Sequence, residues 1–329
     1  MSRYVLCRPI GGLNDTLNQI ERCWSYAEQF DRTLLIDTTR SGLGLAASTY
    51  FNLVDPAIAE RVTMNPDDTL LRQLDEVSCV PRALQGRITS YRSTAAPPHL
   101  NFVDSDSGVR LRFDFKSDYQ ETLLLHEQAG SGSLSLDFLT RVRPSAELRS
   151  EIGQRLTQLP AQRIGIHIRN TDLETDYAPF LNRLARQYPT KTMLVCSDDR
   201  KVVEASRAIF GSDRVVTSSL APDFSGRPIH HEHITSDTRK FQLNAEMFSD
   251  LFALATSDVV ALTPTRAGKV SGFSRLAWLL HRNPIVHETF LSTEPLDPSH
   301  RPAPSKFDRG LPTHVQARRI TNRLTSLFR

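Results

Sequence analysis

Cysteine is scarce in this 329-residue chain, and its four cysteines share no metal-binding spacing. Cys7, Cys23, Cys79 and Cys196 form no CxxC pair, which excludes the common zinc and dithiol motifs. Cys7 and Cys196 lie in apolar segments, where cysteine behaves as a small buried hydrophobic residue. We therefore expect reduced thiols and a cytoplasmic protein.

Long apolar segments and a strong excess of charge are also lacking. No stretch of about 18 apolar residues occurs, so we expect no membrane-spanning helix. The opening residues, MSRYVLCRPIGG, contain no long apolar core, so we expect no secretory signal. A formal net charge of only +3 favours no nucleic-acid partner, although local basic clusters remain suited to small anions.

The composition is that of an ordinary globular protein, with 39% hydrophobic and 23% charged residues. The length suggests two domains of roughly 150 residues each. We place an N-terminal α/β domain at residues 1–160, a second α/β domain at 161–290, and a C-terminal segment at 291–329.

Hydrophobic periodicity predicts a βαβ unit at the start of the chain. Strands are expected at 4–7 and 33–37, and apolar residues with a 3.6-residue period predict a helix between Leu17 and Phe30. Asn14, Asp15 or Thr16 could cap this helix, with Asn14 and Asp15 the natural candidates. A βαβ unit is right-handed by default and implies a parallel sheet.

The rest of the chain continues this alternation. We expect further strands at 109–115, 122–127, 192–199, 214–216, 259–262 and 284–287, and helices at 144–158, 179–188, 201–210, 240–256 and 272–281. This order favours an α/β fold with two Rossmann-like halves facing a cleft.

Polar side chains follow the predicted strands of the second half at their carboxyl ends, where open parallel sheets bind ligands. RIGIHIRNTD (163–172) ends a buried strand with His167 and Arg169. A later segment, Ser271-Gly272-Phe273-Ser274-Arg275, stands at the predicted start of a helix. A helix N-terminus, serine hydroxyls and an arginine together suit a pyrophosphate. The alternative is a histidine and an arginine that make ordinary structural hydrogen bonds.

Several segments resemble the α-1,6-fucosyltransferases and protein O-fucosyltransferases, including the NodZ-like branch of bacterial nodulation-factor enzymes. GIHIRNTD resembles the family's G-[IV]-H-[IV]-R strand motif. RYVLCRPIGGLNDTLNQIERCWSYAEQFDRTLLID, MLVCSDDRKVVE and MFSDLFALATSDVVALTPTRAGKVSGFSRLAWLL resemble further family segments in the family's order. One departure is Asn170, which stands where many relatives carry a second basic residue.

The resemblance implies a GT-B-like fold and inverting, metal-independent transfer of fucose from GDP-fucose to a glycan or oligosaccharide hydroxyl, with no cofactor. By the same resemblance, His167 and Arg169 face the donor diphosphate and Asp250 the guanine edge. Ser271, Gly272, Phe273, Ser274 and Arg275 meet the phosphates or ribose, and His230 lines the donor or acceptor cleft. The glycine turn Gly11–Gly12, with Asn14 and Asp15, faces the sugar in such a cleft. The resemblance also implies that the first domain lies on the acceptor side and that the second domain binds the donor nucleotide.

The acceptor hydroxyl also needs a base, and Asp172, Glu174 and Asp176 follow Arg169 on one loop. Each is a candidate, and a solvated acidic loop is the alternative. Asp250 is likewise open to a simpler interpretation, as a solvent-facing carboxylate on an apolar-striped helix.

Two other segments bear on function. His230, His231 and His233 with Glu232 suggest a metal-dependent hydrolase, but they occupy a loop without helical ligand spacing, and we favour no metal. Residues 310–329 have helical periodicity, and we favour packing on the N-terminal domain over contact with a membrane surface. A GDP-mannose-type transferase, or a protein that binds a nucleotide sugar without turnover, remains an alternative to the fucosyltransferase.

Overall fold

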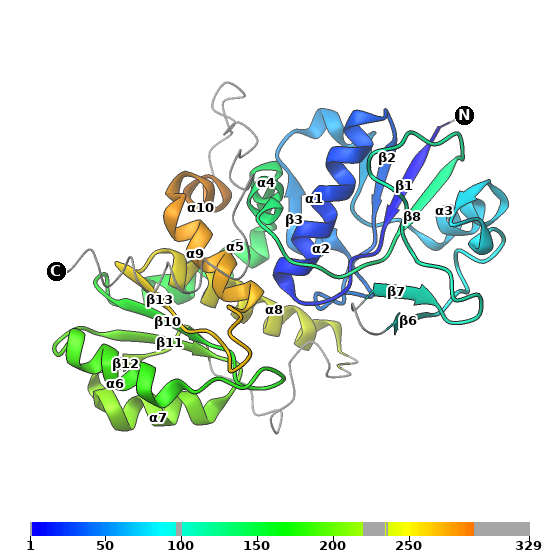
Figure 1. Ribbon diagram of the computed structural model, residues 1–329. Coiled ribbons are helices and arrows are strands. Elements are labelled where there is room, and N and C mark those ends of the chain that lie inside the picture. Colours follow the sequence, from blue (N-terminus) through cyan, green and yellow to red (C-terminus); the bar gives the residue numbers. More distant parts are fainter. Residues whose placement is uncertain (1, 97–100, 220–233, 235, 293–329) are drawn as a thin grey trace. The chain divides into compact units, whose positions relative to one another are not determined.

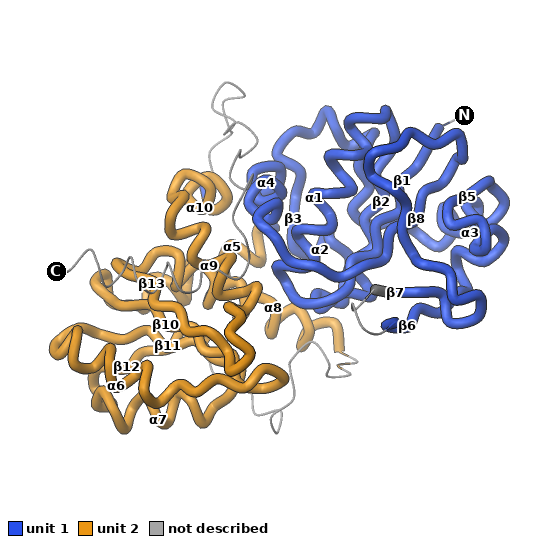
Figure 2. Tube along the Cα trace, in the orientation of Figure 1, with its two compact units in different colours: residues 1–145, 292–301 blue, residues 146–291, 302–329 orange. Residues whose placement is uncertain are grey.

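The computed structural model describes residues 2–96, 101–219, 234 and 236–292. The chain separates into two compact units, one ending at Ser145 and one spanning Ala146–Leu291 (Figure 2). This division falls earlier than residue 160 because helix α5 (Ala146–Thr157) packs against α8 (Asp237–Ala255) of the second unit.

The first unit contains a five-stranded parallel sheet in the order β4-β2-β1-β8-β5. Figure 1 labels its central strands β2, β1 and β8. Its strands are β1 Tyr4–Cys7, β2 Thr33–Ile36, β4 Val62–Thr63, β5 Cys79–Val80 and β8 Leu123–His126. Two antiparallel pairs join β3 (Phe51–Leu53) to β9 (Val142–Pro144) and β6 (Ser93–Ala96) to β7 (Asn101–Asp104). The helices are α1 Leu13–Gln29, α2 Ala47–Tyr50, α3 Asp68–Gln73 and α4 Leu134–Arg141, with single 3-10 turns at Pro56–Ile58, Leu74–Glu76 and Arg82–Leu84.

Strand alternation divides the central residues of this sheet between two faces. Leu6, Leu35 and Leu125 join one buried apolar cluster. Next to them, Cys7 and His126 point to the α1 face, where the His126 Nε2 lies 2.8 Å from the side-chain oxygen of Gln19. The sheet is therefore covered on both faces.

The predicted cap of α1 is wrong. The helix begins at Leu13 with Gly12 as its N-cap, and no side chain makes a capping hydrogen bond. Asn14 Oδ1 accepts a hydrogen bond from the Ser135 hydroxyl at 2.7 Å, and Asp15 Oδ1 accepts one from the Gly130 amide at 3.1 Å. Both side chains lie inside the first helical turn and bind segments distant in sequence.

Two predicted strands are also wrong. Residues 109–115 form only an isolated bridge between Arg110 and Val103. Phe113 is buried in ring contacts with Tyr26 and Phe115, so the alternating pattern reflects burial of a loop and not a strand ladder. Residues 284–287 belong to helix α10 (Pro284–Leu291). A proline is well tolerated at the first helical position, and a four-residue apolar run does not distinguish a strand from a helix.

The second unit contains a four-stranded parallel sheet in the order β12-β11-β10-β13. Its strands are β10 Ile164–Ile168, β11 Met193–Ser197, β12 Val215–Val216 and β13 Val259–Leu262. Besides α5, α8 and α10, its helices are α6 Tyr177–Gln187, α7 Arg200–Phe210 and α9 Gly272–Arg282, and a 3-10 turn covers Ser212–Arg214. The α/β fold class and the predicted elements from 144 to 281 are confirmed.

The two faces of the central strand β10 pack in different ways. Ile164, Ile166 and Ile168 join the apolar cluster that contains residues of α6 and α7. Gly165 lies on the opposite face, where a Cβ would stand 2.8 Å from the Ser257 hydroxyl. The glycine therefore allows the close approach of the segment that ends α8, and the same alternation directs His167 to this side.

Candidate active site

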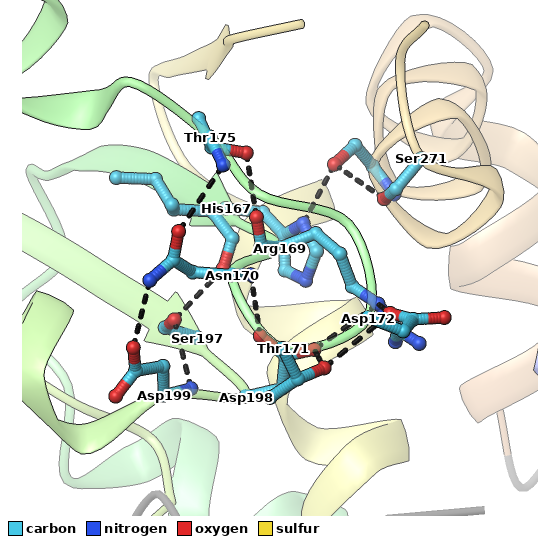
Figure 3. A network of polar contacts seen from close by, with 12 residues as sticks. His167, Arg169, Asn170, Thr171, Asp172, Thr175, Ser197, Asp198, Asp199 and Ser271 are labelled. Atoms are coloured by element: carbon cyan, nitrogen blue, oxygen red, sulfur yellow. Dashed lines mark hydrogen bonds and ion pairs between the residues drawn. The ribbon is translucent and has the colours of Figure 1, made fainter. Parts of the chain in front are cut away.

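The imidazole of His167 lies against the first turn of α9 (Figure 3). Its Nδ1 is 2.6 Å from the Ser274 hydroxyl, and its ring centroid is 4.8 Å from that of Phe273. Ser271 is the N-cap of α9; its hydroxyl accepts a hydrogen bond from the Ser274 amide at 3.1 Å and lies 2.9 Å from the Ser274 hydroxyl. The two segments selected from the sequence therefore meet at one place.

His167 is a neutral hydrogen-bonding group. Burial lowers the pKa of His167 to about 3, with a further contribution from the charge of Arg169. At neutral pH the imidazole carries no charge, so any positive charge offered to a ligand here comes from other residues.

Arg169 follows the end of β10 and is paired with two carboxylates. Its Nε lies 2.7 Å from Asp172 Oδ1 and 3.1 Å from Asp198 Oδ2. Its side chain keeps 20% of its surface exposed, and its two Nη groups make no hydrogen bond within the described part of the chain. The guanidinium is held on its Nε side, and its Nη groups remain suited to an anion.

The loop after β10 is tied to the end of β11 (Figure 3). Asp198 accepts hydrogen bonds from the backbone amide of Asn170 at 2.8 Å and from the Thr171 hydroxyl at 2.6 Å. The side-chain amide of Asn170 donates to Asp199 at 2.7 Å. Asn170 therefore fixes the loop, whereas a second basic residue would add charge to the site.

Thr175 is a residue of this network that sequence reasoning missed. Its hydroxyl donates to the Arg169 carbonyl at 2.5 Å, and its amide donates to the Asn170 side chain at 3.1 Å. Ser197 similarly donates to the Ile168 carbonyl at 2.7 Å. A threonine six positions after an arginine carries no recognisable sequence signal, since the contact depends on the curvature of the loop.

The three candidate bases differ in their surroundings. Asp172 is paired with Arg169, and Glu174 forms an ion pair with Arg266. Asp176 precedes α6, is exposed, and makes no capping hydrogen bond through its side chain. Among the three, Asp176 alone has no basic partner within the described residues.

Asp250 is a partly buried residue of α8. Its carboxylate accepts hydrogen bonds from Ser218 at 2.5 Å and Ser219 at 3.0 Å. Burial raises the pKa of Asp250 to about 6, against the opposing effect of these two hydrogen bonds. The carboxylate is thus not simply solvent-facing. Ser218 and Ser219 were missed by sequence reasoning because they follow β12, far from Asp250 in the chain.

The remaining candidates are placed as follows. Arg275 lies in the first turn of α9, and its amide donates to the Ser271 carbonyl at 3.0 Å. The glycine turn belongs to the first unit, where Gly11 has a φ of +104°. His230 and the neighbouring histidines lie outside the described residues, as does the predicted C-terminal helix.

Metal and membrane features were searched over the described ranges. Those residues contain no group of three or more His, Cys, Asp or Glu side chains arranged to hold a metal ion. None of their helices is both long and apolar enough to cross a bilayer.

Comparison with known proteins gives a match by structure. The chain is similar to the fucosyltransferase NodZ from Bradyrhizobium, with a TM-score of 0.57 and 18% identity over 85% of this chain and 94% of that chain. It is also similar to the NodZ α-1,6-fucosyltransferase co-crystallised with GDP, with a TM-score of 0.57, 18% identity, and coverage of 85% and 93%. The same enzyme soaked with GDP-fucose gives a TM-score of 0.56, 18% identity, and coverage of 85% and 93%.

No family model matches the chain, and no curated protein matches it by sequence. At 18% identity the structural likeness establishes the fold. The GT-B-like α/β class predicted from the sequence is therefore confirmed, and the resemblance to the fucosyltransferases holds at the level of the fold.

Proposed function

We propose that this protein is a glycosyltransferase that moves fucose from GDP-fucose to a hydroxyl of a glycan or oligosaccharide, with inversion and without a metal. The observation that carries the proposal is the contact between His167 and Ser274, which joins the strand-end arginine segment to a helix N-terminus. Such a helix start offers amide groups and a partial positive charge to a phosphate. The fold is one in which the NodZ enzyme has been crystallised with GDP.

In this proposal the diphosphate lies between Arg169 and the first turn of α9. The two Nη groups of Arg169 and the side chain of Arg275 supply positive charge, and Gly272 and Phe273 supply amides of the helix start. The neutral His167 contributes a hydrogen bond. Asp250 accepts hydrogen bonds from the guanine N1–H and exocyclic amine, an edge that adenine and uracil lack.

The transfer is a single displacement at the anomeric carbon. The acceptor oxygen forms a bond to C1 of fucose while the bond from C1 to the β-phosphate oxygen breaks, and GDP leaves with the electron pair. The hydroxyl proton passes to a carboxylate, for which Asp176 is the best-placed candidate because Asp172 and Glu174 are paired with arginines. Negative charge grows on the diphosphate, where Arg169 stabilises it most.

Thermal unfolding with nucleotides tests the donor. We expect GDP and GDP-fucose to raise the melting temperature, with a stabilisation of about 2.7 kcal/mol at about 100 times the dissociation constant. UDP and ADP should have far smaller effects. Equal stabilisation by UDP would contradict the guanine assignment.

Transfer assays separate the remaining alternatives. Release of GDP from GDP-fucose, unaffected by a strong chelator, is the expected outcome. Faster transfer from GDP-mannose than from GDP-fucose would identify mannose as the donor sugar. GDP binding without transfer or donor hydrolysis would indicate a binding protein. Loss of activity with the chelator would contradict metal independence.

A further inference from the structure

The first unit contains a cavity at the carboxyl end of β2, with a volume of about 240 Å³. Its polar lining consists of Asp37, Thr39, Asn65, Asp67 and Asp68, and Ile36 and Leu71 add apolar surface. This is the edge at which parallel α/β sheets receive ligands. All of these residues belong to the first unit, whereas the proposed donor residues of β10, α8 and α9 belong to the second.

Asp37 is the buried charged group of this cavity. Its side chain is 9% exposed, and its Oδ2 accepts a hydrogen bond from Arg8 Nε at 2.8 Å. Its Oδ1 accepts from the Thr39 hydroxyl at 2.6 Å and the Thr39 amide at 3.1 Å. Burial acts to raise the pKa of Asp37, but Arg8 and Thr39 outweigh it and hold the pKa below its ordinary value. The cavity is therefore lined by an oriented, ionised carboxylate.

Arg8 and Asp37 belong to a row of charges across the sheet. Cys7 pairs with Ile36 and with His126 in the parallel register, so the next residues, Arg8, Asp37 and Glu127, stand side by side at the sheet edge.

Glu127 is fully buried. One of its oxygens accepts from the Tyr91 hydroxyl and lies 3.3 Å from an Nη of Arg40, while its Oε1 has no hydrogen-bond partner among the residues that the structure describes. Glu127 and Arg8 do not line the cavity, and of this row only Asp37 faces it, with Arg8 holding its carboxylate from behind.

The lining selects the chemistry of the occupant. Three carboxylates, an amide and a hydroxyl line the cavity, and no lysine, arginine or histidine does. This arrangement repels a phosphate, and the carboxylates are not grouped as a metal site. Carboxylate and amide oxygens accept hydrogen bonds from hydroxyl groups, and Ile36 and Leu71 offer contact to a carbon–hydrogen face.

We propose that this cavity binds one sugar ring of a neutral glycan acceptor, with Asp37 accepting hydrogen bonds from its hydroxyl groups and Arg8 positioning Asp37. The assignment rests on the proposed transferase function and names the subsite for its second substrate. Because the nucleotide is assigned to the second unit, acceptor and donor binding are measurable separately.

The test is saturation-transfer NMR on the full chain in the presence of GDP. The probes are neutral trisaccharides built from glucose, mannose, xylose or N-acetylglucosamine. We expect at least one to bind the unaltered protein and the Asp37→Asn variant to bind it at least about tenfold more weakly, because a hydrogen bond to a charged group is lost. Asn65→Trp, a change at an exposed rim position, should block the cavity without disturbing the Arg8–Asp37 pair.

Asp106→Asn is the matched control, since Asp106 is an exposed carboxylate of the same unit that pairs with Arg87. It should bind sugar normally, and all three variants should bind GDP with unchanged affinity. The proposal is overturned if no trisaccharide binds, if one binds Asp37→Asn and Asn65→Trp normally, or if Ca²⁺ occupies the cavity and no sugar does. Absence of GDP binding would instead contradict the proposed transferase function.

Discussion

The Nε of Arg169 lies 3.1 Å from Asp198 Oδ2, so the residue that follows β10 is held by a residue that follows β11. Asp198 also accepts from the amide of Asn170 and the hydroxyl of Thr171, and its side chain is only 9% exposed. The Asp198 carboxylate thereby fixes the backbone of the loop after β10. It also holds Arg169 by its Nε, which leaves the two Nη groups for a ligand. In the proposed transferase, Asp198 would act on the donor only through Arg169, and we assign it as a positioning residue.

Replacement of Asp198 by Asn should separate binding from turnover. The amide retains the shape but removes a negative charge near the proposed diphosphate, so GDP affinity should stay equal or rise. Arg169 loses a charged partner, and kcat should fall about tenfold as the guanidinium loses its position. Isothermal titration and steady-state kinetics measure the two effects. Asp199→Asn is the comparison, since Asp199 contacts Asn170 and caps α7 without pairing with Arg169; an equal fall in kcat there would contradict the role of Asp198.

Arg169→Ala should lower kcat/KM by roughly 10²–10³, because it removes an electrostatic donor that acts most strongly as the diphosphate gains charge. Arg169→Lys should recover little, since an ammonium group does not reproduce a planar fork. Arg186→Ala, an exposed arginine of α6, is the control. Normal transfer by a folded Arg169→Ala protein would show that this arginine is structural.

Asp250 predicts a pH dependence of nucleotide binding. Burial raises the pKa of Asp250 to about 6, so the carboxylate loses its charge as the pH falls through 6 and accepts guanine donors less well. GDP should bind more weakly at pH 5 than at pH 7. Asp250→Asn should bind GDP weakly at both pH values, which separates this effect from titration of the phosphates. A pH profile identical in the two proteins would exclude Asp250 from guanine recognition.

The same shift has a consequence for stability. A carboxyl pKa raised above its unfolded value of about 3.9 means that the folded state binds the proton more tightly. The contribution of Asp250 therefore becomes less favourable as the pH rises from about 4 to about 6. At pH 7, Asp250→Asn should unfold at an equal or higher urea concentration than the unaltered protein.

Two glycines of the second unit provide a matched pair for stability. A Cβ at Gly165 would stand 2.8 Å from the Ser257 hydroxyl and 3.1 Å from a methyl of Leu254, so Gly165→Ala should destabilise by about 1–3 kcal/mol. Gly153 in α5 has open space around a Cβ, and Gly153→Ala should stabilise by about 0.5–1 kcal/mol. Urea denaturation measures both changes, and a neutral Gly165→Ala would contradict the close approach described for β10.

The sequence by itself determined the α/β alternation, the central strands and the meeting of the β10 end with α9. These features follow from local periodicity and from the rule that parallel strands present their carboxyl ends at one edge, so His167 and Ser274 could be selected without coordinates. Its errors lie where local pattern is ambiguous. The apolar run that begins at Pro284 is compatible with a strand or a helix. Asn14 and Asp15 are residue types that commonly cap helices, but here their side chains bind Ser135 and Gly130.

Only the tertiary structure decided which partners the charged groups have. The pairing of Arg169 with Asp198, the hydroxyl contact of Asp250 with Ser218, and the ion pair of Arg8 with Asp37 each connect residues 29 or more positions apart. Periodicity reports which face of an element is buried, but it carries no information on which polar atoms lie opposite. Those distances depend on sheet register and loop curvature, which are set by the packing of the whole unit.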